Sequence, residues 1–106
     1  QKMNLKNYWI WKIKMFDFDI SDKLRKKLKK LGKRDKVLAR IFYKKLNEVI
    51  EKNKISINTY KNLKSPQNEY KRIHLTDNFI LIFNVNIDTN YILFIDILHW
   101  DNAYKK

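Results

Sequence analysis

The sequence predicts an α+β fold in which a helical hairpin packs on one face of a small, mainly antiparallel β-sheet, in the order β-α-α-β-β-β. Two observations carry this prediction. Two segments in the first half repeat apolar residues at helical spacing, and four other segments are rich in the aromatic and β-branched residues typical of strands. A chain of 106 residues has room for one core, so we assign residues 1–106 to a single domain.

The first strand is predicted over Trp9–Phe18, where apolar and charged side chains alternate. The apolar positions are Trp9, Trp11, Ile13 and Met15, and the charged positions are Lys12 and Lys14. A helix follows, because residues 19–22 supply N-cap side chains. Its apolar positions are Leu24, Leu28 and Leu31. Gly32 stands where a helix C-cap is expected, so residues 33–35 are predicted to form a turn.

A second, longer helix is predicted from about Lys36 to Lys52, with Asp35 as its N-cap. Its apolar stripe consists of Leu38, Phe42, Leu46, Val49 and Ile50, broadened by Ile41. Two helices joined by so short a connection are expected to pack antiparallel. Residues 53–68 are predicted to be irregular, with Pro66 near their end.

Three further strands are predicted in the remainder of the chain, over Tyr70–Leu75, Phe79–Ile87 and Tyr91–Leu98. The segments Thr76–Asn78 and Asp88–Asn90 between them carry the residues that favour tight turns. Such short connections predict an antiparallel meander. The first strand must also pair in this sheet, and the sequence leaves its neighbour open.

One face of the sheet is expected to be polar, because side chains alternate in direction along a strand. The apolar face is expected to hold Ile73, Leu75, Leu81, Phe83, Val85 and Ile87. The opposite face is expected to hold Arg72, His74, Asn84 and Asp96. In the last strand, Leu93, Ile95 and Ile97 are expected on the side opposite Asp96. The polar face is either a working surface or the solvated side of a two-layer fold.

The formal charge of +13 is concentrated in the first part of the chain. Residues 1–64 carry 20 Lys and Arg against 6 Asp and Glu, whereas residues 65–106 carry 4 against 5. This imbalance favours a polyanionic or acidic partner. A compositional bias toward Lys, Asn and Ile, as AT-rich coding produces, accounts for it equally well. The run of lysines over residues 23–30 is by default a solvated helix face.

Several kinds of site are excluded or unsupported by the sequence. The chain has no cysteine, so it forms no disulfide, zinc–thiolate site or cysteine nucleophile. It shows no glycine-rich phosphate loop, paired-carboxylate motif or two-histidine metal spacing. Its longest apolar run, around Phe79–Phe83, is too short to span a membrane, and charged residues interrupt the stretch that a signal peptide would need. We therefore expect a cytoplasmic protein without cofactor or membrane contact.

The order of several short strings resembles the RelE/ParE toxin superfamily. The strings are Ser21–Asp35 for the first helix and turn, Tyr60–Lys64, Pro66 and Tyr70–Leu75 for the entry into the sheet, Phe79–Phe83 for the central strand, and Phe94–Tyr104 for the closing strand. The resemblance covers roughly residues 12–106. Each string is weakly specific alone, and their order and spacing together are more specific.

The resemblance implies a toxin that cuts mRNA, in many members within the ribosomal A site, without a metal. The neighbouring 2′-OH attacks the phosphodiester and leaves a 2′,3′-cyclic phosphate, which requires a base, a proton donor and cations. The residues that it assigns to catalysis are Arg72, His74, His99 and Tyr104. The residues that it assigns to RNA binding are Lys61, Lys64, Lys71 and Trp100, and it assigns no metal ligand.

Two positions depart from the family pattern. The arginine of the central strand is replaced by an apolar residue at or near Ile80, and the arginine after the closing-strand histidine is replaced by Trp100. Losing two guanidinium groups removes charge that would stabilise the transition state. Trp100 can stack on a base instead, as in readers of single-stranded RNA. His99 and Trp100 also fit a packed C-terminal cap over the sheet edge.

Three functions are therefore compatible with the sequence. The first is a metal-independent ribonuclease toxin that acts on mRNA and the ribosome. The second is a RelE-like protein that binds RNA or the ribosome through its basic hairpin without catalysis. The third is a ParE-like inhibitor of a protein target such as a topoisomerase. In each case the resemblance implies a RelB-like antitoxin, which should be acidic because this chain is basic.

Overall fold

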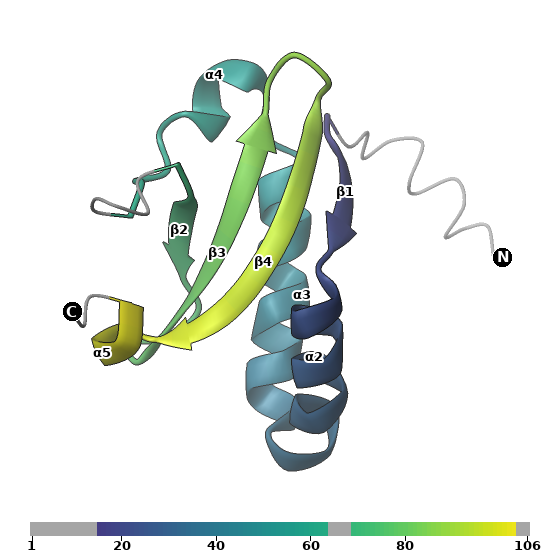
Figure 1. Cartoon of the computed structure of the whole chain (residues 1–106), viewed down its shortest axis with the longest axis vertical. Coiled ribbons are helices and arrows are strands. Elements are labelled where there is room, and N and C mark those ends of the chain that lie inside the picture. Colours follow the sequence, from purple (N-terminus) through teal and green to yellow (C-terminus); the bar gives the residue numbers. More distant parts are fainter. Residues whose placement is uncertain (1–14, 64–68, 104–106) are drawn as a thin grey trace, which may run out of the picture.

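The computed structural model describes residues 15–63 and 69–103 and confirms the predicted α+β fold (Figure 1). Its elements are β1 (Asp17–Ile20), α2 (Asp22–Arg34), α3 (Lys36–Ile50), α4 (Lys54–Ile57), β2 (Lys71–His74), β3 (Phe79–Asn86), β4 (Tyr91–His99) and α5 (Trp100–Ala103). The strands form one sheet in the order β1-β4-β3-β2, and α2 and α3 lie side by side against one of its faces. The antiparallel meander predicted for the last three strands is confirmed.

The partner of the first strand, which the sequence left open, is β4, and the two strands run parallel. β1 begins at Asp17 and ends at Ile20, so Met15 and Phe16 of the predicted strand Trp9–Phe18 precede it. The backbone N–H groups of Met15 and Phe16 donate to the carbonyl of Ile50 at 2.9 and 3.1 Å, which fixes them to the end of α3. The part of that predicted strand before residue 15 lies outside the described residues.

The predicted C-cap at Gly32 is wrong, because α2 continues through Arg34. Lys33 and Arg34 extend the helix favourably, since cations at a helix C-terminus interact well with its dipole. Asp35 alone connects the two helices. Its N–H donates to the carbonyl of Leu31 at the end of α2, and its carboxylate accepts from the N–H of Leu38 at the start of α3, as predicted for an N-cap. The hairpin is therefore joined without a free loop.

The main core lies between the helical hairpin and the sheet. The predicted stripe of α3 is buried at all five positions, and its rings and aliphatic side chains meet Phe83, Ile92 and Phe94 of the sheet. The Phe42 and Phe94 rings are 6.5 Å apart and pack edge to face. Burial of this apolar area is the main favourable term for folding.

Three features of the stretch from the end of α3 to residue 63 differ from the sequence prediction. α3 ends at Ile50, two residues before the predicted Lys52. The segment predicted to be irregular contains α4, which begins because Asn53 and Ser56 form a capping box. Residues 61–63 also pair with the outer side of β2, as the N–H of Leu63 donates to the carbonyl of Tyr70 at 2.9 Å. Both features depend on a few polar side chains and therefore leave little periodicity.

A β-bulge in β4 changes which residues face the helices. β4 has one extra residue, Ile95, between the register pairs Phe83–Phe94 and Ile82–Asp96. Beyond it, Ile97 lies in the main core, while Ile95 packs on the opposite face. The prediction that Ile95 and Ile97 share a side is therefore wrong. A bulge shifts the alternation of a strand by one residue, and the sequence pattern does not reveal it.

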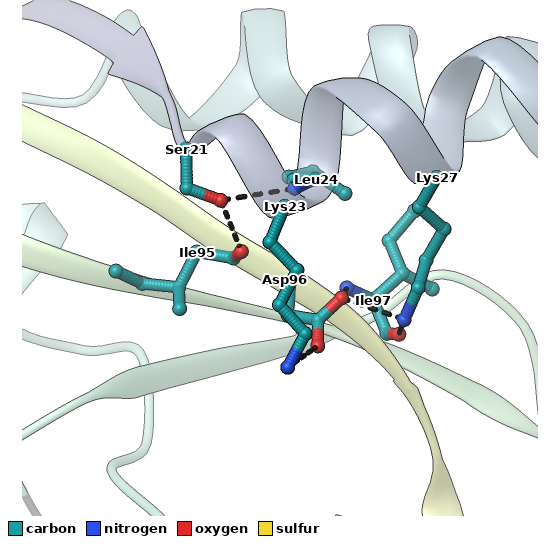
Figure 2. Close-up of polar contacts among 7 residues, drawn as sticks. All are labelled: Ser21, Lys23, Leu24, Lys27, Ile95, Asp96 and Ile97. Atoms are coloured by element: carbon teal, nitrogen blue, oxygen red, sulfur yellow. Dashed lines mark hydrogen bonds and ion pairs between the residues drawn. The ribbon is translucent and has the colours of Figure 1, made fainter.

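The start of α2 is fixed to the edge of β4 by a polar network (Figure 2). The hydroxyl of Ser21, which caps α2, donates to the carbonyl of Ile95 at 2.6 Å. The Lys27 ammonium donates to the carbonyl of Ile97 and to the Asp96 carboxylate, both at 2.7 Å. Asp96 is only 2% exposed, and Lys23 lies 3.3 Å from its second oxygen. Asp96 therefore belongs to the α2–β4 junction and not to the open face predicted for it.

We expect Phe42→Ala to destabilise the protein by about 3–5 kcal/mol, because it removes a fully buried ring and leaves a cavity. The neighbouring substitution Tyr43→Ala is the control, since that side chain is 51% exposed and should cost less than about 1 kcal/mol. Urea unfolding followed by circular dichroism measures both. Equal losses for the two variants would contradict the packing described here.

We expect Asp96→Asn to cost about 1–3 kcal/mol, because Lys27 loses its buried counter-charge while the side chain keeps its volume. Asp101→Asn is the matched control, because the Asp101 side chain is 83% exposed. It should change stability by less than about 0.5 kcal/mol. Urea unfolding of both variants at low and high salt tests the prediction, which fails if Asp96→Asn is neutral.

Candidate functional site

Arg72, His74 and Trp100 form one group on the sheet face opposite the helices. Arg72 and His74 lie two residues apart in β2 and so point to the same side. The Trp100 ring lies 4.8 Å from the His74 ring at an angle of 34°, and the Arg72 Cζ lies 5.4 Å from the Trp100 ring centre. The backbone N–H of Trp100 donates to the carbonyl of Asn78 at 2.7 Å, which holds the start of α5 against the β2–β3 turn.

The floor beside this group is apolar. Leu63, Ile80 and Ile82 are buried there, and the half-buried side chains that pack against them are Tyr70, Ile95, Leu98 and Trp100. The open face is therefore less polar than predicted. Asn84 is half-buried, and its side-chain amide donates to the carbonyl of Glu69 at 3.4 Å. Arg72, half-buried, and His74, exposed, present the basic groups of this surface.

Ile80, one of the two departures from the family pattern, lies in this floor. It is fully buried and pairs in register with His74. An apolar neighbour in place of a cation lowers the local dielectric constant, and electrostatic interactions are stronger where water is excluded. Because Trp100 stands at the second departure and belongs to the same group, the site has two fewer positive charges than the family pattern, and its floor is apolar.

The lysines predicted to bind RNA have different environments. The Lys71 ammonium donates to the carbonyl of Tyr60 at 3.2 Å and to the Asn62 side chain at 3.0 Å, and its partial burial lowers its pKa. Lys71 therefore ties the 60–63 segment to β2. Lys61 is exposed, and its carbonyl accepts from the N–H of Arg72 at 2.9 Å. Lys64 lies outside the described residues.

His99 does not join Arg72 and His74, because it faces the helix side of the sheet. Its ring packs edge-on against Phe79 with centroids 5.3 Å apart, and Phe79 borders the main core. The N–H of Asp101 donates to its Nδ1 at 3.3 Å. Tyr104 lies outside the described residues. Of the four residues predicted to be catalytic, the structure brings Arg72 and His74 together and separates His99 from them.

His99 instead lines a groove of about 990 Å³ beneath α2. The residues around this groove are Lys23, Lys26, Lys27, Lys30, Leu31, Arg34, Asp35, Leu38, Phe79, Ile97, Leu98 and His99. From the sequence alone, these lysines are by default a solvated helix face. The signal for a shared face is their spacing, since residues 23, 26, 30 and 34 follow one another at three or four positions and residue 27 adjoins 26 on the same side of the helix.

The described part of the chain lacks two other kinds of feature. No helix within residues 15–63 and 69–103 is long and apolar enough to cross a membrane. The same residues contain no group of three or more His, Asp or Glu side chains placed to hold a metal ion.

Sequence comparison identifies relatives over nearly the whole chain. A protein of Methanocaldococcus jannaschii named as toxin RelE4 is 38% identical over 92 residues, which are 87% of this chain and 94% of that protein. The chain belongs to the RelE family of toxins. A second relative, from Methanosarcina mazei, is 32% identical over 90 residues, or 85% of this chain and all of that protein. A scan against models of known families gave no match.

Solved structures of the RelE fold agree with this assignment. YafQ from Escherichia coli superposes with a TM-score of 0.61 at 18% identity, over 84% of this chain and 98% of YafQ. A metal-bound toxin from Helicobacter pylori gives 0.64 at 22% identity, over 85% and 100%. RelE in the archaeal RelE–RelB complex from Pyrococcus horikoshii gives 0.55 at 16% identity, over 87% and 99%. Because all three structures are less than 25% identical to this chain, they support its fold but do not assign functions to its individual residues.

We expect Trp100→Ala to shift the His74 ring signals in the proton NMR spectrum, because the indole ring current acts on a ring only 4.8 Å away. It should also cost about 1–3 kcal/mol of stability by removing aromatic and cation–π contacts. The His99 ring signals serve as an internal control, since His99 packs on Phe79 instead. Unchanged His74 signals would disprove the stacking.

Proposed function

We propose that this RelE-family toxin is a metal-independent endoribonuclease that cuts mRNA during translation in the cytoplasm and leaves a 2′,3′-cyclic phosphate. The observation that carries the proposal is the grouping of Arg72 and His74 with an aromatic ring, Trp100, on one open sheet face. Cleavage by the neighbouring 2′-OH needs a cation, a proton-transfer group and a means of orienting the nucleotide. These three side chains supply one of each.

Each side chain has a distinct role in the proposed reaction. Arg72 holds the scissile phosphate, because a guanidinium donates two parallel hydrogen bonds to phosphate oxygens. His74 exchanges the proton of the 2′-OH or of the leaving 5′-oxygen, because the ring nitrogens of an imidazole can both accept and donate a proton. Trp100 stacks on a base beside the cut, since aromatic stacking contributes about 1–3 kcal/mol per base. In this arrangement, the base would replace part of the contact that His74 now makes with Trp100.

The remaining residues named by the family resemblance are assigned by their positions. Lys61 is exposed beside β2 and would contact the RNA backbone, as would Lys64. Tyr104 follows α5 closely in sequence and remains a candidate for stacking or proton relay. We leave His99 out of the proposed centre, because its ring packs against Phe79 on the other face of the sheet.

We also propose that the toxin is held inactive by an acidic, RelB-like antitoxin. Solved complexes of RelE-like and RelB proteins from Mycobacterium tuberculosis and Pyrococcus horikoshii contain chains with the same fold as this one. The formal charge of +13 favours an acidic partner, because opposite charge speeds association and selects against basic partners.

We expect induction of the wild-type protein in a heterologous bacterium to arrest growth and to create new mRNA 5′ ends. The double substitution Arg72→Ala/His74→Ala should abolish both effects, because it removes the phosphate-binding and proton-transfer groups together. Mapping of mRNA ends after induction measures the outcome, and a mass spectrum of the 3′ products tests for the cyclic phosphate. Arg40→Ala, an exposed arginine on α3, is the control and should remain toxic.

The same experiment separates the other functions. Toxicity that survives Arg72→Ala/His74→Ala in a protein of unchanged circular dichroism would refute the nuclease proposal. Arrest of DNA replication with intact mRNA would instead indicate a topoisomerase-directed, ParE-like activity. A folded wild-type protein that leaves growth and mRNA unchanged would point to the non-catalytic function. The loss of activity would then be attributed to the apolar residue Ile80 at the position of a family arginine.

A further inference from the structure

The bulge in β4 is held by the start of α2 (Figure 2). The Ile95 carbonyl accepts from the Ser21 hydroxyl at 2.6 Å, and the Ile97 carbonyl accepts from the Lys27 ammonium at 2.7 Å. Between these two carbonyls, the Asp96 carboxylate accepts from the N–H of Ile97 at 2.8 Å and from Lys27 at 2.7 Å. The polar groups of the bulge therefore depend on two side chains at the start of α2 and on Asp96 itself.

The bulge also sets the register of the rest of β4. Beyond it, the strand pairs regularly with β3 from Asp96 to His99. Regular alternation then places Leu98 and Trp100 on the open face and His99 on the helix side. The contact between the Trp100 and His74 rings, whose centroids are 4.8 Å apart, therefore depends on this register.

A straight β4 would exchange the two faces beyond Phe94. A shift of one residue along a strand turns every following side chain to the other side of the sheet. His99 would then join Arg72 and His74 on the open face, and Trp100 would turn to the helix side. The bulge thus decides which of two neighbouring aromatic residues belongs to the proposed catalytic group.

Asp96 selects the bulged register. The other residues from 95 to 98 are apolar, so they are compatible with either face. In a straight strand, Asp96 would follow Phe94 on the side of the main core, where a carboxylate among apolar side chains is strongly unfavourable. In the bulged strand, the buried carboxylate lies 3.3 Å from the Lys23 ammonium and 2.7 Å from that of Lys27. Such charged partners are what a buried carboxylate needs, so α2 and the bulge hold each other in place.

We propose that Asp96 is a positioning residue for the reaction: together with Ser21 and Lys27 it holds the bulge that places Trp100, and not His99, beside His74. This inference rests on the proposed nuclease function and adds to it a residue that acts from the α2 junction. Asp96 acts through β4 on the ring that orients the nucleotide, and not by contact with RNA. Orientation matters because a misplacement of about 1 Å can lower a rate about 100-fold.

The main test is Asp96→Leu, because a leucine is favourable in the main core and removes the reason for the bulge. The His74 ring signals in the proton NMR spectrum should lose the shift that the Trp100 indole ring causes. Val49→Ala is the control, since it also removes buried contacts but lies in α3, outside α2 and β4. Its His74 signals should match those of the wild type.

Ser21 supplies a second pair of variants, which decides the question if Asp96→Leu does not fold. Ser21→Asp keeps an N-cap acceptor for α2 but has no proton to donate to the Ile95 carbonyl. Ser21→Thr keeps both functions. The His74 signals should therefore change in Ser21→Asp and stay unchanged in Ser21→Thr, whereas a role in capping alone would leave both variants like the wild type.

Cleavage is measured on ribosomes programmed with a defined mRNA, so that kcat and KM are obtained separately. Asp96→Leu should lower kcat about tenfold or more, because Trp100 no longer orients the nucleotide. KM should stay within about threefold, since Arg72 in β2 still holds the phosphate. Val49→Ala, at a temperature where it is folded, should match the wild type in both constants.

Two results overturn the inference. The first is a folded Asp96→Leu protein with wild-type His74 signals or wild-type kcat, because Asp96 then only stabilises the fold. The second is an equal change of the His74 signals in Val49→Ala, because the ring contact then follows overall stability and not the bulge. Failure of the nuclease proposal is a different outcome, namely a wild type that leaves the ribosome-bound mRNA intact. In that case the NMR comparison still decides whether Asp96 places Trp100.

Discussion

The contact between the start of α2 and the edge of β4 determines how the rest of the molecule is arranged. β1 pairs with β4 only as far as Phe94, so within residues 15–63 and 69–103 no strand lies beside the next stretch of the β4 edge. The Ser21 hydroxyl and the Lys27 ammonium take over, donating to the carbonyls of Ile95 and Ile97. A buried carbonyl without a donor costs about 1–3 kcal/mol, so α2 completes the edge that a longer β1 would have completed.

The two faces of the sheet differ in the side chains that they present near this junction. On the helix side, α2 is held across the end of β4, and its basic residues stand over an apolar floor that includes Ile97. On the other side, the bulge at Ile95 moves an apolar residue into the open face, where a polar one was expected. Basic groups therefore concentrate at one end of that face, around Trp100. The group of Arg72, His74 and Trp100 and the basic groove beneath α2 therefore lie on opposite faces of the sheet.

The candidate site was predictable where the chain is locally regular. Arg72 and His74 lie in a short strand without irregularity, so their common direction follows from sequence alone. Their contact with Trp100 does not, because it depends on the antiparallel register that brings the end of β4 beside the end of β2 through Ile80. The same register explains why His99, one residue before Trp100, points to the opposite face. Sequence proximity and family resemblance had grouped His99 with residues that it does not meet.

The sequence by itself determined the β-α-α-β-β-β order, a helix cap within residues 19–22, the cap at Asp35 and the apolar stripe of α3, since each depends on residues within one or two turns of chain. Only the tertiary structure decided the parallel pairing of β1 with β4, the bulge, the burial of Asp96 and the groove beneath α2. The physical reason is distance along the chain. Lys27 and Asp96 are 69 residues apart, and no local pattern records that a lysine on a polar helix face will meet a buried carboxylate there.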